Sequence, residues 1–404
     1  MNAVGIVVEY NPFHNGHLYH AASAKAQTES DLVIAVMSGN FLQRGEPALI
    51  DKWARTQMAL ENGVDIVFEL PYECATAHAP SFASGAIQLL DAAGCSSFCF
   101  GSENGTIAPF TTTLNRIASV QPQYEFVIRE SIQQGMSYPR ALNQAYSQLI
   151  HSSEAEQDIV DLSLPNNILG FHYMEAARTI NSSMLPATLP RLGAGYHDDV
   201  THGVPIASAT GIRKEFFESE NTENIRQFVP DSSYDALKDW LNTRGQFGSW
   251  DRFYPILRFQ IIRDGPSQLA SIADVTEGIE NLLYKAAKQA TTFQQFMGIV
   301  KSKRYTWTRI QRMLTHIYTG FTYQNRLSMQ APDHLRLLGM TQIGQAYLKE
   351  KKDEMKLPVV SRLAKFESDS TQFSASATDL YAFGIDPVHP LLGMDYRMPP
   401  IRIL

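Results

Sequence analysis

Two histidines near the start of the chain, His14 and His17, are separated by Asn15 and Gly16. Imidazoles three positions apart on the first turn of a helix can face one anion together, and each can donate a hydrogen bond to a phosphate. Gly16 lets a phosphate approach the backbone, and a helix that begins there offers free N–H groups and the positive end of its dipole. Attack on an α-phosphate needs alignment and donors where charge develops. The segment therefore predicts phosphate chemistry, with His14 and His17 as catalytic residues.

The same histidine pair admits two simpler interpretations. Histidines at this spacing can ligate a metal, but Glu9 is the only carboxylate nearby and no cysteine completes a ligand set, so we expect no metal site. A solvated pair of loop histidines is the other alternative. A β-branched run over residues 4–9 precedes the turn and a helical pattern follows from Gly16. This strand–turn–helix context favours phosphate chemistry.

A second group of polar residues lies much later, in residues 207–213. Ser208 and Thr210 offer hydroxyls that can cap a helix, and Arg213 offers a guanidinium that can bind a phosphate through two hydrogen bonds. Taken alone, the segment is equally well explained as an ordinary helix N-cap. Together with the histidine turn, it predicts a second phosphate contact, with Arg213 as a catalytic residue.

Alternating strands and helices surround these residues in the first part of the chain. Apolar runs rich in β-branched residues predict strands over residues 4–9, 32–37, 64–68 and 97–100. Helical patterns follow from Gly16 and over residues 52–62 and 83–93. Such alternation predicts an α/β, Rossmann-like domain with a parallel sheet, in which ligands bind beyond the carboxyl ends of the strands. We therefore expect the loops after these strands to form the functional edge.

The pattern changes near residue 229. Beyond it, helical periodicity covers residues 234–241, 279–289, 308–318 and 342–350. We therefore predict a catalytic domain over residues 1–229 and a mainly α-helical domain over residues 230–404. Residues 368–378 are dominated by Ser, Thr and Ala and are predicted to form a loop.

The composition is that of an ordinary soluble globular protein. The chain has 404 residues, of which 44% are hydrophobic and 19% charged, and no apolar run approaches the roughly 20 residues needed to cross a bilayer. No basic region followed by an apolar stretch marks a signal peptide, so we expect a cytoplasmic protein. The three cysteines, Cys74, Cys95 and Cys99, are too few for a disulfide framework and lack zinc-ligand spacing. We expect them to be buried or half-buried free thiols.

The charges are distributed unevenly along the chain. The net charge of −7 argues against uniform binding to nucleic acid, yet residues 281–332 contain eight Lys or Arg residues and no Asp or Glu. Part of this stretch alternates cations with aromatic residues, which can bind phosphates and stack on unpaired bases. The alternative is a solvated helix face whose aromatic residues belong to the core. The candidate RNA-binding residues are Lys301, Lys303, Arg304, Tyr305, Trp307 and Arg309.

The histidine turn resembles the His-x-Gly-His signature of the nucleotidyltransferase superfamily. Residues 207–213 resemble its second signature, Ile-Ser-Ser-Thr-x-x-Arg, with alanines in place of the isoleucine and of the second serine, so that Ala209 lacks one possible phosphate donor. The likeness extends to the family of bacterial tRNA(Met) cytidine acetate ligases. It is carried by residues 7–17, 37–41, 43–48, 70–71, 100–103 and 303–309, and so it spans most of the chain.

This resemblance implies an ATP-dependent ligase. ATP, with Mg²⁺, and acetate would form acetyl-adenylate and release pyrophosphate. The acetyl group would then pass to the exocyclic amine of the wobble cytidine in elongator tRNA(Met), held by the helical domain. Composition and spacing alone indicate neither acetate nor tRNA.

The resemblance also implies the residues of the ATP site. Gly101 ends a strand where a missing side chain admits a base or ribose, and Asn166 can read an adenine edge or simply form a turn. Ser38, Gly39 and Asn40 can form a polar pocket for the acetate carboxylate, or an ordinary turn after a strand. Arg191 can face phosphate or lie on the surface. The predicted ATP contacts are Val7, Val8, Glu9, Tyr10, Asn11, Pro12, Phe13, His14, Asn15, Gly16, His17, Leu18, Tyr19, His20, Gly101, Asn166, Arg191, Ser208 and Thr210.

Two other functions remain open from the sequence. A small-molecule adenylyltransferase that makes a dinucleotide-type cofactor would use the same histidine turn without RNA, but the helical domain and its acid-free stretch favour the tRNA ligase. A non-catalytic nucleotide- or RNA-binding protein would not require both His14 and His17.

Overall fold

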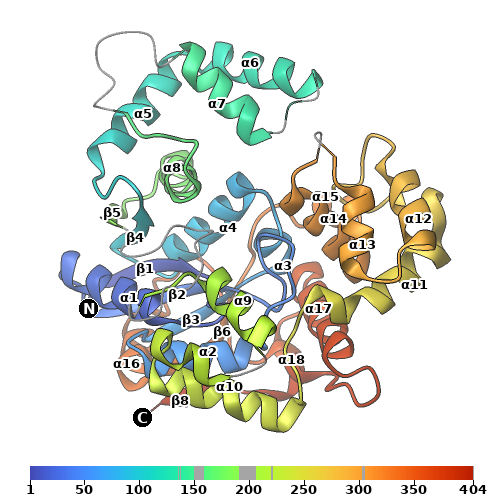
Figure 1. Cartoon of the computed structure of the whole chain (residues 1–404). Helices are drawn as coiled ribbons and strands as arrows, with labels where there is room; N and C mark the ends of the chain where they lie inside the picture. Colours follow the sequence, from blue (N-terminus) through green and yellow to red (C-terminus); the bar gives the residue numbers. More distant parts are fainter. Residues whose placement is uncertain are drawn as a thin grey trace.

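A single sheet forms the centre of the protein (Figure 1). The computed structural model of the chain describes residues 1–134, 136, 138–149, 159–190, 206–219, 222–302 and 305–403. Within these residues the sheet has eight strands in the order β5-β4-β1-β2-β3-β6-β7, with β8 paired to β6. The strands are β1 Ala3–Val8, β2 Leu32–Ser38, β3 Ile66–Leu70, β4 Ser97–Ser102, β5 Leu185–Pro190, β6 Leu335–Thr341, β7 Val359–Val360 and β8 Ile401–Ile403.

The strands from β5 to β3 run parallel, and β6 joins β3 antiparallel. Every residue of β2 and β3 is buried, because helices cover both faces of a parallel sheet. The four strands predicted from the sequence are confirmed as β1 to β4, with ends that differ by no more than two residues. The predicted Rossmann-like α/β fold is therefore confirmed for the first part of the chain.

Helices cover both faces of the sheet, and a separate hydrophobic core lies on each face. Successive residues of a strand point to opposite faces, so Val33 and Ala35 of β2 pack in one core while Ile34 and Val36 pack in the other. Helices α1 Asn15–Gln27 and α2 Lys52–Glu61 contribute to the first core. Helices α4 Ala79–Ala92 and α8 Pro165–Thr179 contribute to the second.

Additional helices extend the first half of the chain. Three of them, α5, α6 and α7, lie above α8 at the top of Figure 1 and were not predicted from the sequence. The helices of this group are α3 Tyr72–Ala75, α5 Ala108–Ser119, α6 Gln121–Gln133, α7 Tyr138–Leu149 and α9 Ala209–Ser219, and a 3-10 helix follows over Thr222–Phe228.

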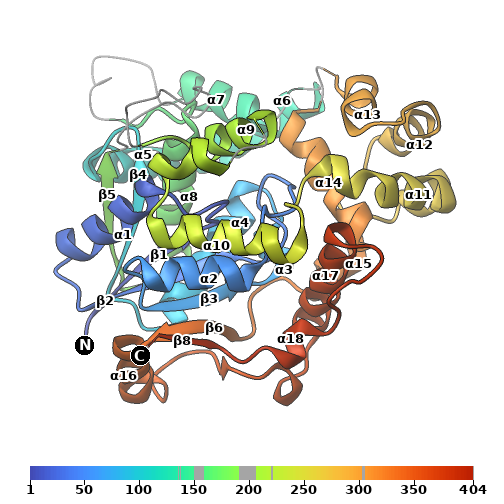
Figure 2. The same cartoon turned by 60° about the horizontal axis from the view of Figure 1, so that its bottom comes forward.

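The second half is largely helical, as predicted. Its helices are α10 Asp231–Arg244, α11 Trp250–Leu269, α12 Ile279–Gln289, α13 Phe293–Val300, α14 Trp307–Thr319, α15 Tyr323–Ser328, α16 Gln342–Lys351, α17 Asp369–Ile385 and α18 Met394–Arg397, with a 3-10 helix over Leu363–Lys365. Figure 2 shows α10 lying against α2, and α17 and α18 running beside the sheet. Four predicted helices fall within α10, α12, α14 and α16.

Two details of the sequence interpretation differ from the structure. Strands β6, β7 and β8 return to the central sheet, so the segment 230–404 is not purely helical and does not stand apart from residues 1–229. Residues 369–385 form helix α17 rather than a loop, because Ser368 caps the helix through Thr371 and the small side chains of Ala375 and Ala377 pack in the interior. Ser, Thr and Ala here serve close packing rather than a turn.

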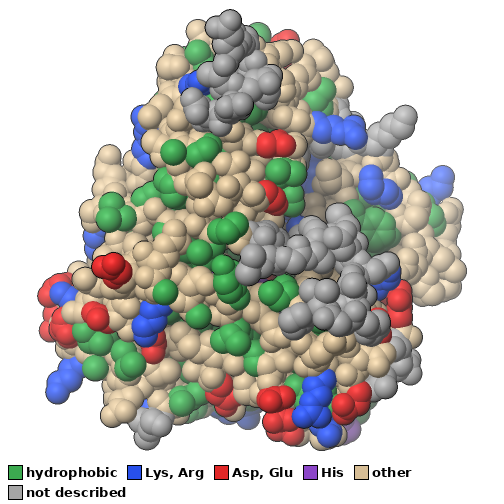
Figure 3. Space-filling view, turned by 60° about the vertical axis from the view of Figure 1, so that its left-hand side comes forward, with side chains coloured by type: hydrophobic (Ala, Val, Ile, Leu, Met, Phe, Trp, Pro, Cys, Tyr) green, Lys and Arg blue, Asp and Glu red, His purple; other side chains and the backbone are tan. Residues whose placement is uncertain are grey.

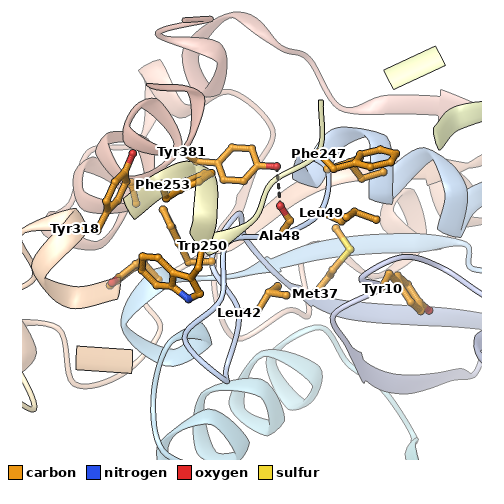
Figure 4. Packing of buried hydrophobic residues seen from close by; sticks show 14 of the residues in the cluster. Tyr10, Met37, Leu42, Ala48, Leu49, Phe247, Trp250, Phe253, Tyr318 and Tyr381 are labelled. Carbon is orange, nitrogen blue, oxygen red and sulfur yellow. Dashed lines mark hydrogen bonds between the residues drawn. The ribbon is translucent and has the colours of Figure 1, made fainter. Parts of the chain in front are cut away.

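A shared core joins the two halves of the chain (Figure 4). The Tyr381 hydroxyl donates a hydrogen bond to the Ala48 carbonyl at 2.9 Å, and the Trp250 indole N–H donates to the Gly45 carbonyl at 2.8 Å. Phe41 packs against Phe253, Tyr318 and Tyr381 with ring centroids about 6 Å apart. The loop between β2 and α2 is thus held by helices that follow it by about two hundred residues or more.

The cysteines agree with the expectation from the composition. Cys74, Cys95 and Cys99 are free and buried, as predicted. None of the helices in the described ranges is long and apolar enough to span a membrane. On the face shown in Figure 3, acidic and basic side chains are interspersed, without a broad field of one charge.

Candidate active site

A cavity of about 220 Å³ opens at the carboxyl ends of three neighbouring parallel strands, β5, β4 and β1. This is the edge at which ligands bind in open parallel sheets. Residues from the N-terminal turns of α1, α8 and the segment before α9 complete its wall. The lining residues are Val7, His14, Gly16, His17, Tyr19, His20, Phe100, Gly101, Asn166, Leu169, Tyr173, Leu189, Pro190, Ile206, Ala207 and Ser208.

His14 and His17 are fixed against each other at the start of α1. His14 is the N-cap residue: its Nδ1 accepts a hydrogen bond from the Gly16 N–H at 3.0 Å. The Nδ1 of His17 accepts from the His14 N–H at 3.3 Å, which completes a capping box. The two rings stack with centroids 3.7 Å apart. A neutral imidazole whose Nδ1 is an acceptor carries its proton on Nε2, so both residues are set to donate through Nε2–H.

The geometry also explains the glycine between the histidines. A Cβ atom on Gly16 would lie 2.8 Å from Cε1 of His14, closer than ordinary packing permits. A larger residue would therefore displace the His14 ring or remove its bond to the Gly16 N–H. Gly16 is needed both for the N-cap and for access to the backbone at the helix start.

Buried rings and hydrogen bonds to other parts of the fold hold the turn before the histidines in place. Tyr10 and Phe13 are buried, and their rings lie 4.9 Å and 5.7 Å from that of His17. Asn11 accepts a hydrogen bond from the Leu49 N–H at 2.7 Å, and buried Arg55 donates to the Glu9 carbonyl at 2.6 Å. These contacts hold the histidines before any ligand binds.

Glu9 turns away from the cavity into the protein. Its Oε1 accepts from the Gln43 N–H at 2.7 Å and lies 3.5 Å from the Ser38 hydroxyl. Burial raises the pKa of Glu9, while the Gln43 N–H and nearby Arg44 oppose this shift. Glu9 therefore supports the turn, and the described residues that line the cavity include no carboxylate.

The opposite wall forms a slot with mostly apolar sides. Phe100, Leu169, Tyr173 and Leu189 line the cavity together with Gly101, which has no side chain to occupy it. Burial raises the pKa of Tyr173, so its hydroxyl stays protonated. Such a slot beside two histidines suits a purine base whose phosphates reach α1.

Asn166, which lines the cavity, is held in place by Glu103. The Asn166 Nδ2 donates to Glu103 Oε1 at 2.6 Å, and the backbone N–H groups of Asn166 and Asn167 donate to the two Glu103 oxygens at 3.2 Å and 2.8 Å. In return, Asn167 Oδ1 accepts from the N–H groups of Glu103 and Asn104. The sequence indicated Asn166, but not the role of Glu103, which precedes α8 by more than sixty residues.

Ser208 and Arg213 occupy different positions at the start of α9. Ser208 lines the cavity, and its hydroxyl accepts from the Gly211 N–H at 3.1 Å. Arg213 lies behind the histidine turn, where it donates to the Asn11 carbonyl at 2.8 Å and pairs with Glu46 at 3.1 Å. Arg213 and Thr210 are absent from the described cavity wall, so here Arg213 supports the turn rather than facing the cavity.

The predicted acetate residues do not line this cavity. Ser38 and Asn40 are buried, and the carbonyls of Ser38 and Gly39 accept hydrogen bonds from Arg55. Asn40 Oδ1 accepts from the Lys52 N–H at 2.8 Å. Buried Arg and Lys require such acceptors, so the alternative of a structural turn after the strand describes the segment better than an open carboxylate pocket.

The predicted RNA-binding residues are only partly open to solvent. Lys301 is exposed and Trp307 is 41% exposed. Tyr305 is buried, its hydroxyl lies 3.0 Å from Glu277, and the Arg309 guanidinium covers its ring at 4.8 Å. The prediction that Tyr305 stacks on a base is therefore corrected, because its ring already packs within the protein. Arg191, Lys303 and Arg304 lie outside the described residues.

No metal centre is found in the described part of the chain, where no three His, Cys, Asp or Glu residues gather. The polar cavity groups are imidazole, hydroxyl and amide, which are poor ligands for Mg²⁺. A magnesium ion that enters with a nucleotide would thus be held chiefly by phosphate oxygens and water.

The fold and the histidine turn define a nucleotidyltransferase, and comparison with known families agrees. The HIGH Nucleotidyl Transferase family model matches residues 1–390. The chain belongs to this family and, within it, to the tRNA(Met) cytidine acetate ligases, as its relatives establish.

Proteins named tRNA(Met) cytidine acetate ligase match along the whole chain. The protein from Lysinibacillus sphaericus (strain C3-41) is 52% identical over 404 residues, which cover 100% of both chains. That from Bacillus subtilis (strain 168) is 42% identical over 412 residues and covers 100% of this chain and 97% of its own. The crystal structure of Thermotoga maritima TmcAL bound with alpha-thio ATP superposes with a TM-score of 0.90 at 32% identity, over 100% of both chains. The family resemblance inferred from the sequence is confirmed.

Proposed function

We propose that this protein activates acetate with ATP and transfers the acetyl group to the N4 amine of the wobble cytidine in elongator tRNA(Met). The observation that carries the proposal is the stacked His14–His17 pair at the start of α1, with both Nδ1 atoms used as acceptors. The full-length likeness to named ligases supports the choice of substrates. Acetate, ATP and the tRNA are thus its substrates, and the cytoplasm is its place of action.

The first step forms acetyl-adenylate. A carboxylate oxygen of acetate attacks the α-phosphorus of ATP, the bond from that phosphorus to the β-phosphate bridging oxygen breaks, and pyrophosphate leaves. His14 and His17 donate Nε2–H hydrogen bonds to phosphate oxygens as negative charge builds on them. The adenine lies in the slot beside Gly101, and the N-terminal turns of α1 and α9 face the phosphates. A Mg²⁺ ion that entered with ATP would be held by phosphate oxygens and would supply positive charge to offset that of the leaving pyrophosphate.

The second step consumes the adenylate. The cytidine N4 amine attacks the acetyl carbonyl carbon, the bond from that carbon to the AMP oxygen breaks, and AMP and a proton leave. The face around Lys301, Trp307 and Arg309 binds the tRNA, since Lys301 and Trp307 are exposed within a stretch that lacks acidic residues. Lys303 and Arg304 belong to the same sequence stretch.

The proposal is tested by two assays on the purified protein. Exchange of labelled pyrophosphate into ATP should depend on acetate and should need no other acceptor. Labelled acetate should then appear in unmodified elongator tRNA(Met) only when ATP is present. Exchange that proceeds without acetate but requires a mononucleotide acceptor would instead identify a cofactor-forming adenylyltransferase.

A variant separates the two steps. Replacement of Lys301, Lys303, Arg304 and Arg309 by glutamine should spare acetate-dependent exchange and strongly reduce acetyl transfer, because activation needs only the cavity. Removal of about four phosphate contacts should also lower the salt dependence of tRNA binding. Circular dichroism serves as the folding control. Unchanged tRNA affinity and transfer in the folded variant would place the RNA on another face.

A further inference from the structure

An arginine without an acceptor lies where α14 meets the catalytic half of the protein. Arg312 is half-buried, and its Nε is shielded from solvent yet has no hydrogen-bond partner. Within the described residues, the guanidinium of Arg312 forms no hydrogen bond or ion pair. Buried donors in folded proteins nearly always have an acceptor, so this group indicates a ligand that supplies one.

The surroundings of Arg312 are strongly positive. Arg309, Arg312 and His316 recur at helical spacing on one face of α14. Burial lowers the pKa of Arg312, Asp274 opposes this, and the charges of Arg309 and Arg326 lower it further. An anion placed between these guanidinium groups would relieve their repulsion.

Asp274, the carboxylate that acts on Arg312, is already engaged by other groups. Asp274 pairs with Arg326 at 2.6 Å, and His316 Nε2 lies 3.6 Å from its second oxygen. Although burial alone would raise it, these partners hold the pKa of Asp274 below its usual range. Residues 281–332 contain no further Asp or Glu, so neighbouring sequence offers Arg312 no other anion.

The position of Arg312 is fixed relative to the cavity. Gly45 packs directly on the backbone of α14, because a Cβ atom at position 45 would lie 2.2 Å from the backbone nitrogen of Arg312. The φ of Gly45, +74°, also favours glycine. The residues on both sides of Gly45 reach the histidine turn, because Gln43 binds Glu9 and Glu46 binds Arg213, which holds Asn11. These contacts therefore set the position of Arg312, and of a ligand bound to it, relative to His14.

We propose that Arg312, flanked by Arg309 and Arg326, binds a backbone phosphate of the RNA substrate. A guanidinium offers several N–H donors in one plane and suits a phosphodiester better than a lysine does. The role follows from the position: a phosphate held at this junction sets the distance from the RNA chain to the adenylate cavity. The inference rests on the proposed tRNA-modifying function and adds a docking point outside residues 301–309.

The test compares Arg312→Gln with Lys288→Gln. Lys288 belongs to the same acid-free stretch, but it is exposed on α12, where its ammonium lies over Tyr284. Both variants lose one positive charge. Binding of unmodified elongator tRNA(Met) is measured over a series of KCl concentrations, with acetate-dependent pyrophosphate exchange as the control for fold and cavity.

We expect Arg312→Gln to weaken tRNA binding by roughly tenfold or more, the usual effect of losing a charge-assisted hydrogen bond. The slope of log K against log salt should fall by about 0.7 to 0.9, the value for one phosphate contact. Lys288→Gln should change the affinity far less, and exchange should stay normal in both. Arg312→Lys should keep the salt slope and regain only part of the affinity.

Equal losses in the two glutamine variants would overturn the inference, since they would reflect general charge rather than a site. A free anion is distinguished by thermal stabilisation with inorganic phosphate or pyrophosphate at constant ionic strength. If Arg312→Gln abolished that stabilisation while tRNA affinity stayed at the wild-type value, the site would hold a small anion and not RNA. Acetylation of the tRNA by the wild type is measured in parallel. If the proposed function is wrong, the wild type itself will not acetylate the tRNA. If only this inference is wrong, the wild type will acetylate it, and the two glutamine variants will not differ in tRNA affinity.

Discussion

Replacement of Glu103 by Gln should relax the choice of nucleotide base. A carboxylate can only accept hydrogen bonds, so the Asn166 side chain must turn its NH₂ group towards Glu103, as the 2.6 Å contact shows. Its carbonyl oxygen is thereby fixed on the other side of the amide, where it can accept from the 6-amino group of adenine. A glutamine at position 103 can present either oxygen or NH₂, so Asn166 is free to flip.

The expected size of the effect follows from one hydrogen bond. Glu103 is exposed, so the lower range for a net hydrogen bond, about 1 kcal/mol, applies to loss of the adenine contact. An inosine base places O6 against the Asn166 oxygen, and two facing acceptors cost roughly 1–3 kcal/mol. Together these contributions are about 2–4 kcal/mol, so wild-type protein should prefer ATP over ITP by roughly 30- to 700-fold, and Glu103→Gln should reduce this ratio to a few-fold.

The assay is acetate-dependent pyrophosphate exchange with ATP, ITP and purine riboside triphosphate, compared as kcat/KM. Glu130→Gln, an exposed change on α6, is the matched control and should keep the wild-type ratio. A purely structural role for Glu103 predicts that all three nucleotides lose activity by the same factor. An unchanged ATP/ITP ratio in Glu103→Gln would refute the reasoning.

Three further predictions follow from the site and the core. His14→Ala or His17→Ala should lower pyrophosphate exchange by about 10²–10³, the usual cost of one preorganised donor, with near-normal circular dichroism; exchange close to the wild-type rate would remove the assigned role. Arg213→Ala should reduce kcat and leave the KM for ATP almost unchanged, because Arg213 holds the Asn11 carbonyl and Glu46 behind the turn; a rise in KM alone would instead place it on the phosphates. Burial raises the pKa of Glu73 to about 7, with a smaller opposing effect of its hydrogen bond from Ser370. Because the folded pKa of about 7 lies above the unfolded value of about 4.5, the wild type should lose stability relative to Glu73→Gln as pH rises from about 4.5 to about 7, by up to about 3 kcal/mol in urea unfolding, with little further change at higher pH; parallel curves for the two proteins would contradict the shift.

The parts of the site that the sequence predicted are local ones. His14, Gly16 and His17 act through one helix start, so their spacing along the chain is also their geometry. Parallel strands bring their carboxyl ends to one edge, and this placed Gly101 beside the histidines. Ser208 follows the same rule, since it is a helix N-cap wherever the helix lies. The RNA-binding residues stay a prediction.

The parts that the sequence did not predict depend on distant partners. Ser38 and Asn40 look like a ligand loop along the chain, but buried Arg55 and Lys52 take up their oxygen atoms. Tyr305 looks like a stacking residue, but Glu277 and Arg309 enclose it. Polarity along a sequence indicates that a group needs a partner, and it does not indicate whether the partner is a ligand or another part of the fold.

Buried charge pairs also show that a division near residue 229 does not separate two independent units. Lys52 is fully buried and binds both Glu69, at 2.7 Å, and Asp395, at 2.8 Å, so one carboxylate comes from β3 and the other from the end of the chain. An unpaired buried ammonium would cost several kcal/mol. Two buried cations, Lys52 and Arg336, are here balanced by two buried carboxylates, and one of these comes from each segment. Arg336 of β6 adds a contact to the same Asp395. The C-terminal segment therefore completes the charge cluster at the start of α2. The same region supports the histidine turn, through Arg55 of α2 and Leu49 of the preceding loop. The helical half is thus part of the scaffold that sets the geometry of the active site, besides being the surface proposed to bind RNA.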